Sequence, residues 1–314
     1  MSLFCRHNRL TANCPICSRE LQAELKAKAP PSPPRGRGAG TTTSRRPRAS
    51  SARSSGVVTR RVARAADDGY RNALAPGLRA TADAQRLAGA LAAAAARLEP
   101  PGPYGALAAE PDREQATWLA FLLALAGPDA PDLQHALLEA RPAWTAGAPD
   151  ERPENDPAAA GGLPDALSAR ARRTAAAYRA WAARSGSQAA AFEGDVGWSP
   201  QRRFSRVFER LALPGFGRAP RYDLLTALGA AGLYALRAGE LLVGGEDDPT
   251  TLAAKRLLVS GDRLLLERRA RELAEACAVP IAALDRGLAV WNTPAAEVDE
   301  TADAPAIRAA LGLR

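Results

Sequence analysis

Apolar positions recur along most of this chain at the three- and four-residue spacing of an α-helix, and no stretch alternates apolar and polar residues long enough to predict a strand. The pattern therefore predicts an all-α fold without internal repeats. The predicted helices cover Thr81–Leu98, Glu114–Leu125, Asp132–Ala140, Asp165–Ser185, Ser187–Phe192, Pro200–Leu211, Arg221–Leu228, Thr250–Val259, Leu264–Cys277 and Ile281–Trp291.

Helix start and stop signals support these assignments. Ser199 followed by Pro200 has the typical form of a helix N-cap and first helical residue. The helix from Glu114 to Leu125 is apolar on all sides, which predicts that it lies buried at the centre of the domain.

The composition divides the chain into segments. Residues 1–20 contain a cluster of metal-ligand residue types, and residues 21–66 form a basic linker rich in Pro, Ser and Arg that we expect to be mostly disordered. Residues 67–314 are predicted to form the helical domain, with a mobile acidic loop over residues 142–165.

Charge follows the same division. The whole chain carries a formal charge of +8, but residues 1–66 have 14 Lys or Arg against 2 Asp or Glu, so the remainder is net acidic. A basic arm of this kind binds DNA by neutralising phosphates, or it serves only as a solvated linker, and the sequence leaves both readings open. No apolar run approaches the roughly 18 residues of a membrane span, and no secretory signal is visible. We expect a cytoplasmic, bacterial-type protein without a membrane partner.

The amino terminus has the ligand spacing of a zinc site. Cys14 and Cys17 are separated by two residues, so one turn presents both thiolates to one ion, and Cys5 and His7 supply two further donors. Four protein ligands leave no open coordination position, which predicts a structural Zn²⁺ that stabilises a small module. The alternative is a group of unpaired thiols beside an unrelated His.

A second motif lies between two predicted helices. In Leu-Ala-Leu-Pro-Gly-Phe-Gly-Arg, Pro214 and Gly215 permit a tight turn and Gly217 permits close backbone approach. Exposed N–H groups at the start of the following helix favour an anion, here a DNA phosphate. An ordinary helix–turn–helix connection remains the alternative. The predicted DNA-binding residues are Pro214, Gly215, Phe216, Gly217 and Arg218.

The hairpin, the helix Trp118–Leu125 and the acidic segment downstream resemble the helix-hairpin-helix DNA glycosylase superfamily. Within it, the carboxy-terminal pattern resembles the alpha-glutamyl/putrescinyl thymine pyrophosphorylase family over roughly residues 70–293. The segments that carry this resemblance are Asp248–Arg256, Gly261-Asp262, Leu265–Arg269 and Leu284–Asn292.

The resemblance implies packed helices that bind DNA and receive a flipped, hydroxymethylated pyrimidine, which is activated by a phosphate-type group during thymine hypermodification. It also implies ATP and Mg²⁺ as co-substrate and cofactor, and other DNA-modification enzymes as partners. The candidate catalytic residues are Asp248, Asp247 and Lys255, with Arg256, Arg268 and Arg269 as further cations for phosphates. The two acids equally suit a helix N-cap before Pro249.

Two other functions stay open. Glycosylases that also cleave the strand carry a Lys just after the hairpin, where this chain has Ala219, so the superfamily resemblance is compatible with a monofunctional DNA N-glycosylase. A non-catalytic protein that docks on DNA through the zinc module and hairpin is the third reading.

Overall fold

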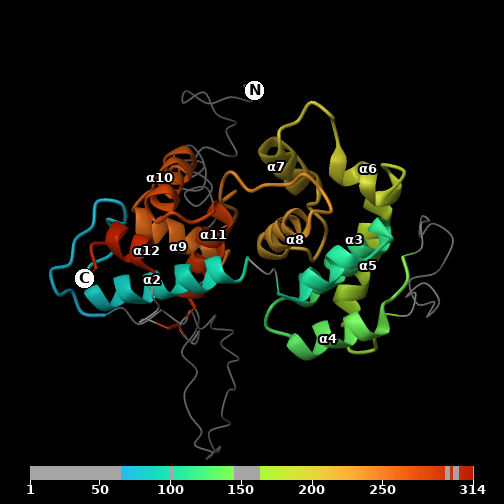
Figure 1. Cartoon of the computed structure of the whole chain (residues 1–314), viewed down its shortest axis with the longest axis horizontal. Helices are drawn as coiled ribbons and strands as arrows, with labels where there is room; N and C mark the ends of the chain where they lie inside the picture. The colour runs from blue at the N-terminus through green and yellow to red at the C-terminus, as the bar shows by residue number, and fades with distance from the viewer. Residues whose placement is uncertain are drawn as a thin grey trace, which may run out of the picture. The chain divides into compact units, whose positions relative to one another are not determined.

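The computed structural model describes residues 65–98, 102–144, 163–245, 247–293, 298–299 and 304–313. The chain divides into two compact units, Met1–Val58 and Thr59–Arg314, and the described residues all belong to the second. Its described residues form helices and no strand, which confirms the predicted all-α class (Figure 1). The helices are α2 (Thr81–Ala96), η2 (a 3₁₀ helix, Gly102–Ala109), α3 (Arg113–Ala126), α4 (Pro131–Ala140), α5 (Ala169–Ala183), α6 (Gln188–Glu193), α7 (Pro200–Arg210), α8 (Arg218–Ala230), α9 (Pro249–Leu258), α10 (Arg263–Ala276), α11 (Ile281–Trp291) and α12 (Pro305–Ala310).

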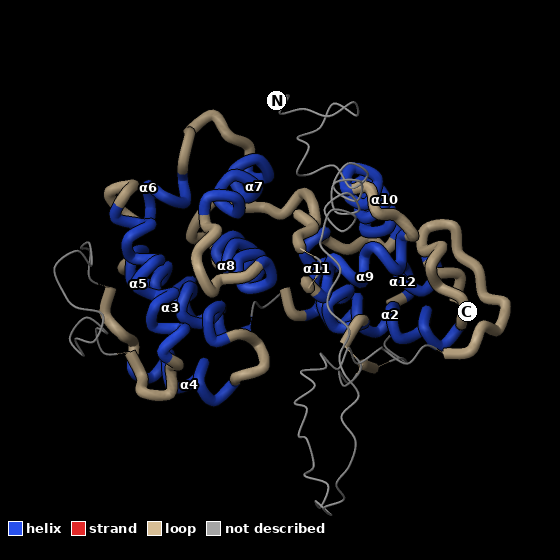
Figure 2. The backbone as a smooth tube through the Cα atoms, turned by 180° about the vertical axis from the view of Figure 1, so that it is seen from behind, coloured by secondary structure: helices blue, strands red, loops and turns tan. Residues whose placement is uncertain are grey.

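The first helical group is built around α3. Every residue from Ala116 to Ala124 on this helix is buried, as its all-round apolar sequence predicted. Helices α4, α5, α6 and α8 pack against it, and Figure 2 shows the same arrangement from behind. The Trp118 ring lies 5.6 Å from Phe121 and 5.8 Å from Tyr178, so aromatic packing fills the centre of this core.

The second helical group joins segments that are far apart in sequence. Helix α2 packs against α11, which also contacts α9 and α10. Leu87, Leu257, Leu284 and Trp291 are among the side chains buried in this second core. The chain before α2 also lies on the carboxy-terminal residues, since the Asn72 side chain donates to the Ala310 carbonyl at 3.0 Å.

Helix caps account for most of the observed boundaries. Asp112, Ser168, Ser187, Ser199, Asp248 and Asp262 each accept a hydrogen bond from a backbone N–H in the first turn of the helix that follows. Burial of Trp291, which is 2% exposed, and of Cys277, which is 1% exposed, confirms that both belong to the core.

Two helices begin three or four residues from the predicted position, and two further elements differ from the sequence prediction. Helix α5 begins after Ser168 and not at Asp165, and α8 begins at Arg218 and not at Arg221. Pro220 is tolerated in α8 because N–H groups of the first turn have no intrahelical acceptor. The 3₁₀ helix η2 and the short helix α12 were not predicted at all. The predicted loop at 142–165 lies mostly outside the described residues.

Candidate functional site

The segment between α7 and α8 forms a tight turn with a definite geometry. The Phe216 N–H donates to the Leu213 carbonyl at 3.1 Å, and Gly215, with φ of 79°, occupies the position of a type II turn that requires positive φ. Pro214 precedes it, at the position where its fixed φ is favourable. The sequence Leu-Pro-Gly-Phe therefore specifies this turn locally.

Two contacts hold the turn against α5 and α8. The Thr174 hydroxyl on α5 donates to the Pro214 carbonyl at 2.9 Å. The Arg221 guanidinium donates to the Gly217 carbonyl at 3.2 Å and to the Phe208 carbonyl at 3.1 Å. The hairpin is thus fastened on both sides, and its backbone is pre-organised for any ligand that it binds.

The exposed backbone of this hairpin has the features of an anion site. Within the part of the chain that the structure describes, the N–H groups of Gly215 and Gly217 donate to no acceptor. Gly217 is the N-cap of α8. The first-turn N–H groups of this helix point out of its N-terminus, and the positive end of the helix dipole lies at the same place. The Arg170 guanidinium approaches the turn from α5. Backbone donors and a nearby cation together suit a phosphate.

The five predicted DNA-binding residues do not share one environment. Pro214, Gly215 and Gly217 are exposed. Phe216 is buried, with its ring 5.1 Å from Phe121, so its side chain anchors the hairpin to the core. Arg218 is 6% exposed and faces inward. The Phe216 and Arg218 side chains therefore lie inside the protein, and a contact of either residue with DNA stays a prediction.

Arg218 is the centre of a buried polar cluster. Its guanidinium donates to Asp285 on α11 and to the Leu241 and Leu242 carbonyls, and it lies 3.6 Å from Asp248. The side chains of Arg218 and Asp285 are 4% and 5% exposed. Burial raises the pKa of Asp285 to about 7, although the Arg218 charge opposes that shift. This cluster joins the two helical groups.

The same cluster fixes the extended segment before α9. Glu267 is buried and accepts from the Leu241 N–H at 2.7 Å and from the Val243 N–H at 3.1 Å. Arg218 satisfies the carbonyls of the same segment, where Leu242 has a positive φ of 53°. Side chains thus replace the backbone partners that a sheet would provide.

The predicted catalytic acids lie at the start of α9. Asp248 caps this helix by accepting from the N–H and hydroxyl of Thr251, each at 2.7 Å, which confirms the N-cap reading of the sequence. Its side chain is 8% exposed, whereas Asp247 is exposed. Lys255 is half-buried on α9, two helical turns beyond Asp248. The structure therefore does not gather the three residues around one cavity, and their catalytic role stays a prediction.

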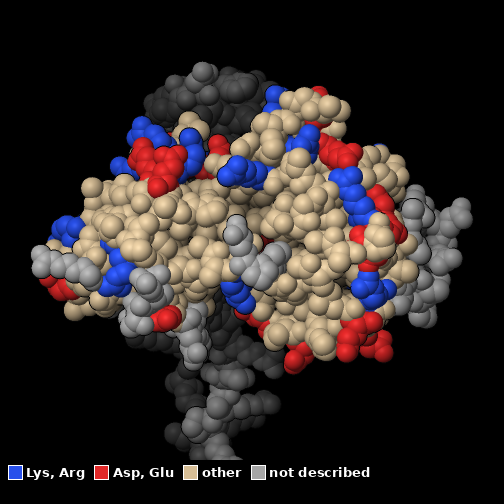
Figure 3. Space-filling view, viewed as in Figure 1, with Lys and Arg blue, Asp and Glu red and all other residues tan. Residues whose placement is uncertain are grey.

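The cations proposed to hold donor phosphates have partners within the protein. Arg256 lies 3.6 Å from Asp83 and covers the Trp291 ring at 4.6 Å. Arg269 donates to the Leu258 carbonyl at 2.5 Å, and Arg268 faces Glu272 at 3.7 Å. Acidic and basic side chains lie side by side over α10 (Figure 3). A mixed surface of this kind favours the solvated-helix reading of these residues.

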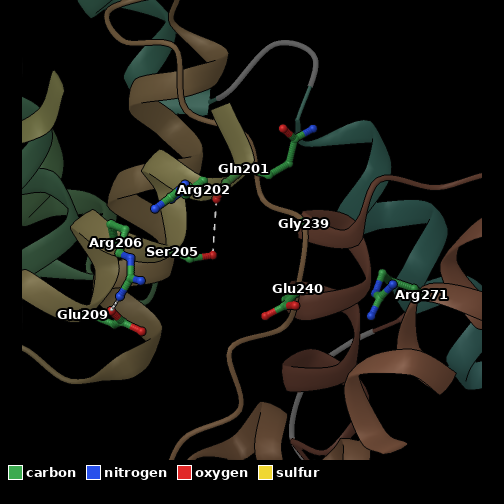
Figure 4. A pocket seen from close by; sticks show the side chains of 8 residues that line it. All are labelled: Gln201, Arg202, Ser205, Arg206, Glu209, Gly239, Glu240 and Arg271. Carbon is green, nitrogen blue, oxygen red and sulfur yellow. Dashed lines mark hydrogen bonds and ion pairs between the residues drawn. The ribbon is translucent and has the colours of Figure 1, made fainter. Parts of the chain in front are cut away.

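An open groove lies between α7 and α10. It has a volume of about 520 Å³ and contains three arginines and two glutamates. In Figure 4, Arg206 and Glu209 pair with each other on α7, while Arg271 comes from α10 beyond the segment of Gly239 and Glu240. The charges of both signs and the open form suit a weak surface contact more than an enclosed reaction site.

The predicted zinc ligands Cys5, His7, Cys14 and Cys17 lie outside the described residues, so the Zn²⁺ site stays a prediction. Among the residues that the structure does describe, no group of three or more His, Cys, Asp or Glu side chains is placed to hold a metal ion. No described helix has the length and apolar character needed to cross a membrane.

Sequence reasoning missed Asp285 as the buried partner of Arg218. A signal was present, because an Asp-Arg pair at 285–286 interrupts the otherwise apolar helix α11, and charged residues are rarely buried unless paired. What the sequence lacked was the partner, which is separated from Asp285 by 67 residues.

The fold and hairpin define an all-helical domain with a pre-organised helix–turn–helix that exposes backbone donors. Residues 165–297, which span α5 to α11, match the family model described as alpha-glutamyl/putrescinyl thymine pyrophosphorylase clade 3. The resemblance to this family is thereby confirmed over that segment. No curated protein and no solved structure matches the chain.

Proposed function

We propose that this protein is an enzyme of thymine hypermodification, which binds DNA and activates a hydroxymethylated pyrimidine by transfer of a phosphate-type group. The observation that carries the proposal is the family match over residues 165–297, since this segment contains the hairpin and both of its helices. The family is named for a thymine pyrophosphorylase, and the activity is inferred for this chain from that likeness.

The hairpin supports the DNA-binding part of the proposal. Exposed N–H groups at Gly215 and Gly217, the start of α8 and the neighbouring Arg170 provide a site for one backbone phosphate. Contacts of this type position DNA and carry no sequence information. We therefore expect weak, sequence-independent binding by residues 67–314, whose net charge is acidic.

The proposed reaction forms one bond between phosphorus and oxygen. The hydroxymethyl oxygen of the base attacks a phosphorus atom of ATP, the displaced part of the nucleotide leaves with the bonding electrons, and the hydroxyl proton passes to solvent or a base. Mg²⁺ neutralises the donor phosphates in reactions of this class. Few protein ligands are needed, because Mg²⁺ is usually held by one or two carboxylates together with the substrate phosphates.

Mass spectrometry of short DNA duplexes tests the proposal. Duplexes containing thymine, uracil or 5-hydroxymethyluracil are incubated with the full-length protein, Mg²⁺ and ATP. Added phosphate mass on the hydroxymethylated base alone is the expected result. Loss of a base, leaving an abasic site, would replace the proposal with an N-glycosylase, a reading that Ala219 permits because no Lys stands there to cut the strand.

A matched pair of variants tests the hairpin in the same assay. Gly217→Ala adds a methyl group that meets nothing closer than Pro220 at 4.0 Å, so the fold is retained while a phosphate is held off the backbone. We expect DNA affinity to fall several-fold. Gly245→Ala, at an exposed glycine with open space around it, is the control. Equal DNA affinity of the unaltered protein, Gly217→Ala and Gly245→Ala would show that the hairpin does not contact DNA. If no substrate base is altered in the mass spectra, the protein would be a non-catalytic DNA-docking protein.

A further inference from the structure

A small cavity lies beside α8, and none of the predicted catalytic or DNA-binding residues lines it. It has a volume of about 120 Å³ and is bounded by η2, α8 and α11, together with the ends of α2 and α3. A closed cavity of about 150 Å³ holds one benzene ring, so this partly open cavity has the scale of a single six-membered ring. Tyr104 and Tyr222 contribute aromatic surface to its wall.

Two charged side chains face each other at this cavity. Asp223 on α8 and Arg286 on α11 lie 3.6 Å apart and keep 29% and 24% of their side chains exposed, in contrast to the closed pair of Arg218 and Asp285. Burial raises the pKa of Asp223 against the opposing charge of Arg286. An acceptor and a donor are thus presented side by side within reach of a ligand.

A third polar group at the cavity has an unmet hydrogen bond. The Thr226 hydroxyl oxygen is buried, and it has no hydrogen-bond partner among the described residues. Leaving a buried hydroxyl unpaired is costly, so such groups usually indicate a water or a ligand that completes the site. Thr226 lies three positions after Asp223, so the two residues are on the same face of α8.

We propose that this cavity binds the pyrimidine ring of the substrate, with Asp223 and Arg286 recognising its hydrogen-bonding edge and Thr226 completing the contacts. In thymine and in 5-hydroxymethyluracil the ring N–H donates and the adjacent carbonyl oxygens accept, which matches a carboxylate beside a guanidinium. A free phosphate is disfavoured by the Asp223 charge, and the second fused ring of a purine exceeds the single-ring scale of the cavity.

This assignment rests on the proposed function and names the residues that bind the ring, which lie on α8 and α11 and do not include Asp247 or Asp248. The face of α8 that carries Asp223 and Thr226 continues to Ala230, and all three line the cavity. Residues of one helix face therefore form one wall, while Arg286 approaches from the other helical group.

Direct binding of nucleosides to the full-length protein tests the inference without any turnover. Saturation-transfer NMR is recorded with thymidine, 5-hydroxymethyl-2′-deoxyuridine and 2′-deoxyadenosine. The variants are Asp223→Asn, which removes the charge and keeps the shape, and Thr226→Val, which removes only the hydroxyl. Glu209→Gln is the matched control, since its pair with Arg206 at 3.1 Å lies in the separate groove at α7.

The expected result is binding of both pyrimidine nucleosides and not of the purine. Asp223→Asn should weaken that binding about tenfold and Thr226→Val about threefold, in line with the loss of a charged and a neutral hydrogen bond. Glu209→Gln should leave it unchanged. Thermal unfolding shows whether Asp223→Asn folds. If it does not, the nucleoside affinity of Thr226→Val is the test of the cavity.

Absence of pyrimidine binding to the unaltered protein, equal binding of the purine, or full affinity in both cavity variants would each overturn the inference. The outcomes separate it from the proposed function. Nucleoside binding that maps to the cavity, without modification of DNA, contradicts only the proposed reaction. Modification that persists unchanged in both cavity variants contradicts only the assignment of this cavity.

Discussion

At the scale of single residues, the molecule uses two acid–arginine pairs in different ways. Asp285 and Arg218 are almost fully buried and connect the two helical groups, whereas Asp223 and Arg286 stay partly exposed at a cavity. Burial of a closed pair contributes little net stability, because desolvation offsets the attraction, but removal of one partner leaves an uncompensated charge. The two pairs should therefore respond differently to substitution.

Replacing Arg218 by Met should destabilise the fold by about 3–5 kcal/mol, since Asp285 and the Leu241 and Leu242 carbonyls lose their donor. Urea unfolding of the full-length protein measures the effect. Arg206→Met is the control, because the Arg206 side chain is 52% exposed and a surface pair of this kind contributes about 0–1 kcal/mol. A loss no greater than that of the control would show that the buried cluster does not hold the helical groups together.

The acid of the closed pair should also make stability depend on pH. Because burial raises the folded-state pKa of Asp285 from 3.8 to about 7, its neutral form is favoured in the fold. Its contribution is present in full below about pH 4 and is lost as the pH rises through 7. From pH 5 to pH 8 the unfolding free energy of the unaltered protein should fall, and this fall should exceed that of Asp285→Asn by at least about 1.4 kcal/mol, the equivalent of one pKa unit. Parallel profiles in urea unfolding would contradict this.

A further residue, Thr226, gives a simple stability readout. Its buried hydroxyl has no partner among the described residues, so Thr226→Val replaces an unsatisfied polar atom with a methyl group of similar size. The melting temperature should stay the same or rise. Thr117→Val is the matched control, because the Thr117 hydroxyl is buried and lies 2.9 Å from the Tyr234 hydroxyl, and there the melting temperature should fall. If Thr226→Val lowered the melting temperature as much as Thr117→Val, the Thr226 hydroxyl would contribute a hydrogen bond in the unliganded protein.

At the scale of helices and turns, the sequence predicted what local chemistry decides. The Ser199–Pro200 start of α7 and the buried course of α3 followed from a cap and from an unbroken apolar run. The predicted helix began too late, at Arg221, although a proline in the first turn, here Pro220, removes no hydrogen bond. The short helix α12 has only six residues and depends on packing of Ile307 and Leu311 in the second core, which no local pattern reveals.

The hairpin is the element where backbone conformation decides function, and its two exposed glycines should differ in stability. Gly215 has positive φ, and a Cβ atom there collides with the Thr174 hydroxyl, so Gly215→Ala should cost about 1–3 kcal/mol. Gly217→Ala adds no close contact and should change the unfolding free energy by less than about 0.5 kcal/mol. Chemical denaturation of both variants checks the contrast. Equal costs would mean that the turn is not held in the type II form.

At the scale of the whole molecule, the candidate site was only partly predictable. The hairpin is contiguous in sequence, so its turn, exposed glycines and family resemblance were accessible before the fold was known. The cavity and the Arg218 cluster each bring together residues from α8 and α11. The Arg218–Asp285 pair is buried and the Asp223–Arg286 pair is partly exposed, a difference that depends on the packing of the folded protein. Long-range pairings of this type leave no periodic signal in the sequence.

Charge is divided along the chain so that affinity for DNA should depend on the segment before the helical domain. Residues 1–66 carry a net charge of +12, against −4 for the remainder, in which Arg170 lies beside the hairpin. Each phosphate neutralised by a cation steepens the fall of binding with salt by about 0.9 in log–log slope. Deleting residues 30–64, which removes 9 of the 14 basic side chains in that region, should therefore flatten the slope, and fluorescence anisotropy of a labelled duplex between about 50 and 200 mM salt measures it. An unchanged slope would show that residues 30–64 act only as a tether. The hairpin would then remain as the phosphate contact, and Gly217→Ala should weaken DNA binding equally in the full-length and the deleted protein.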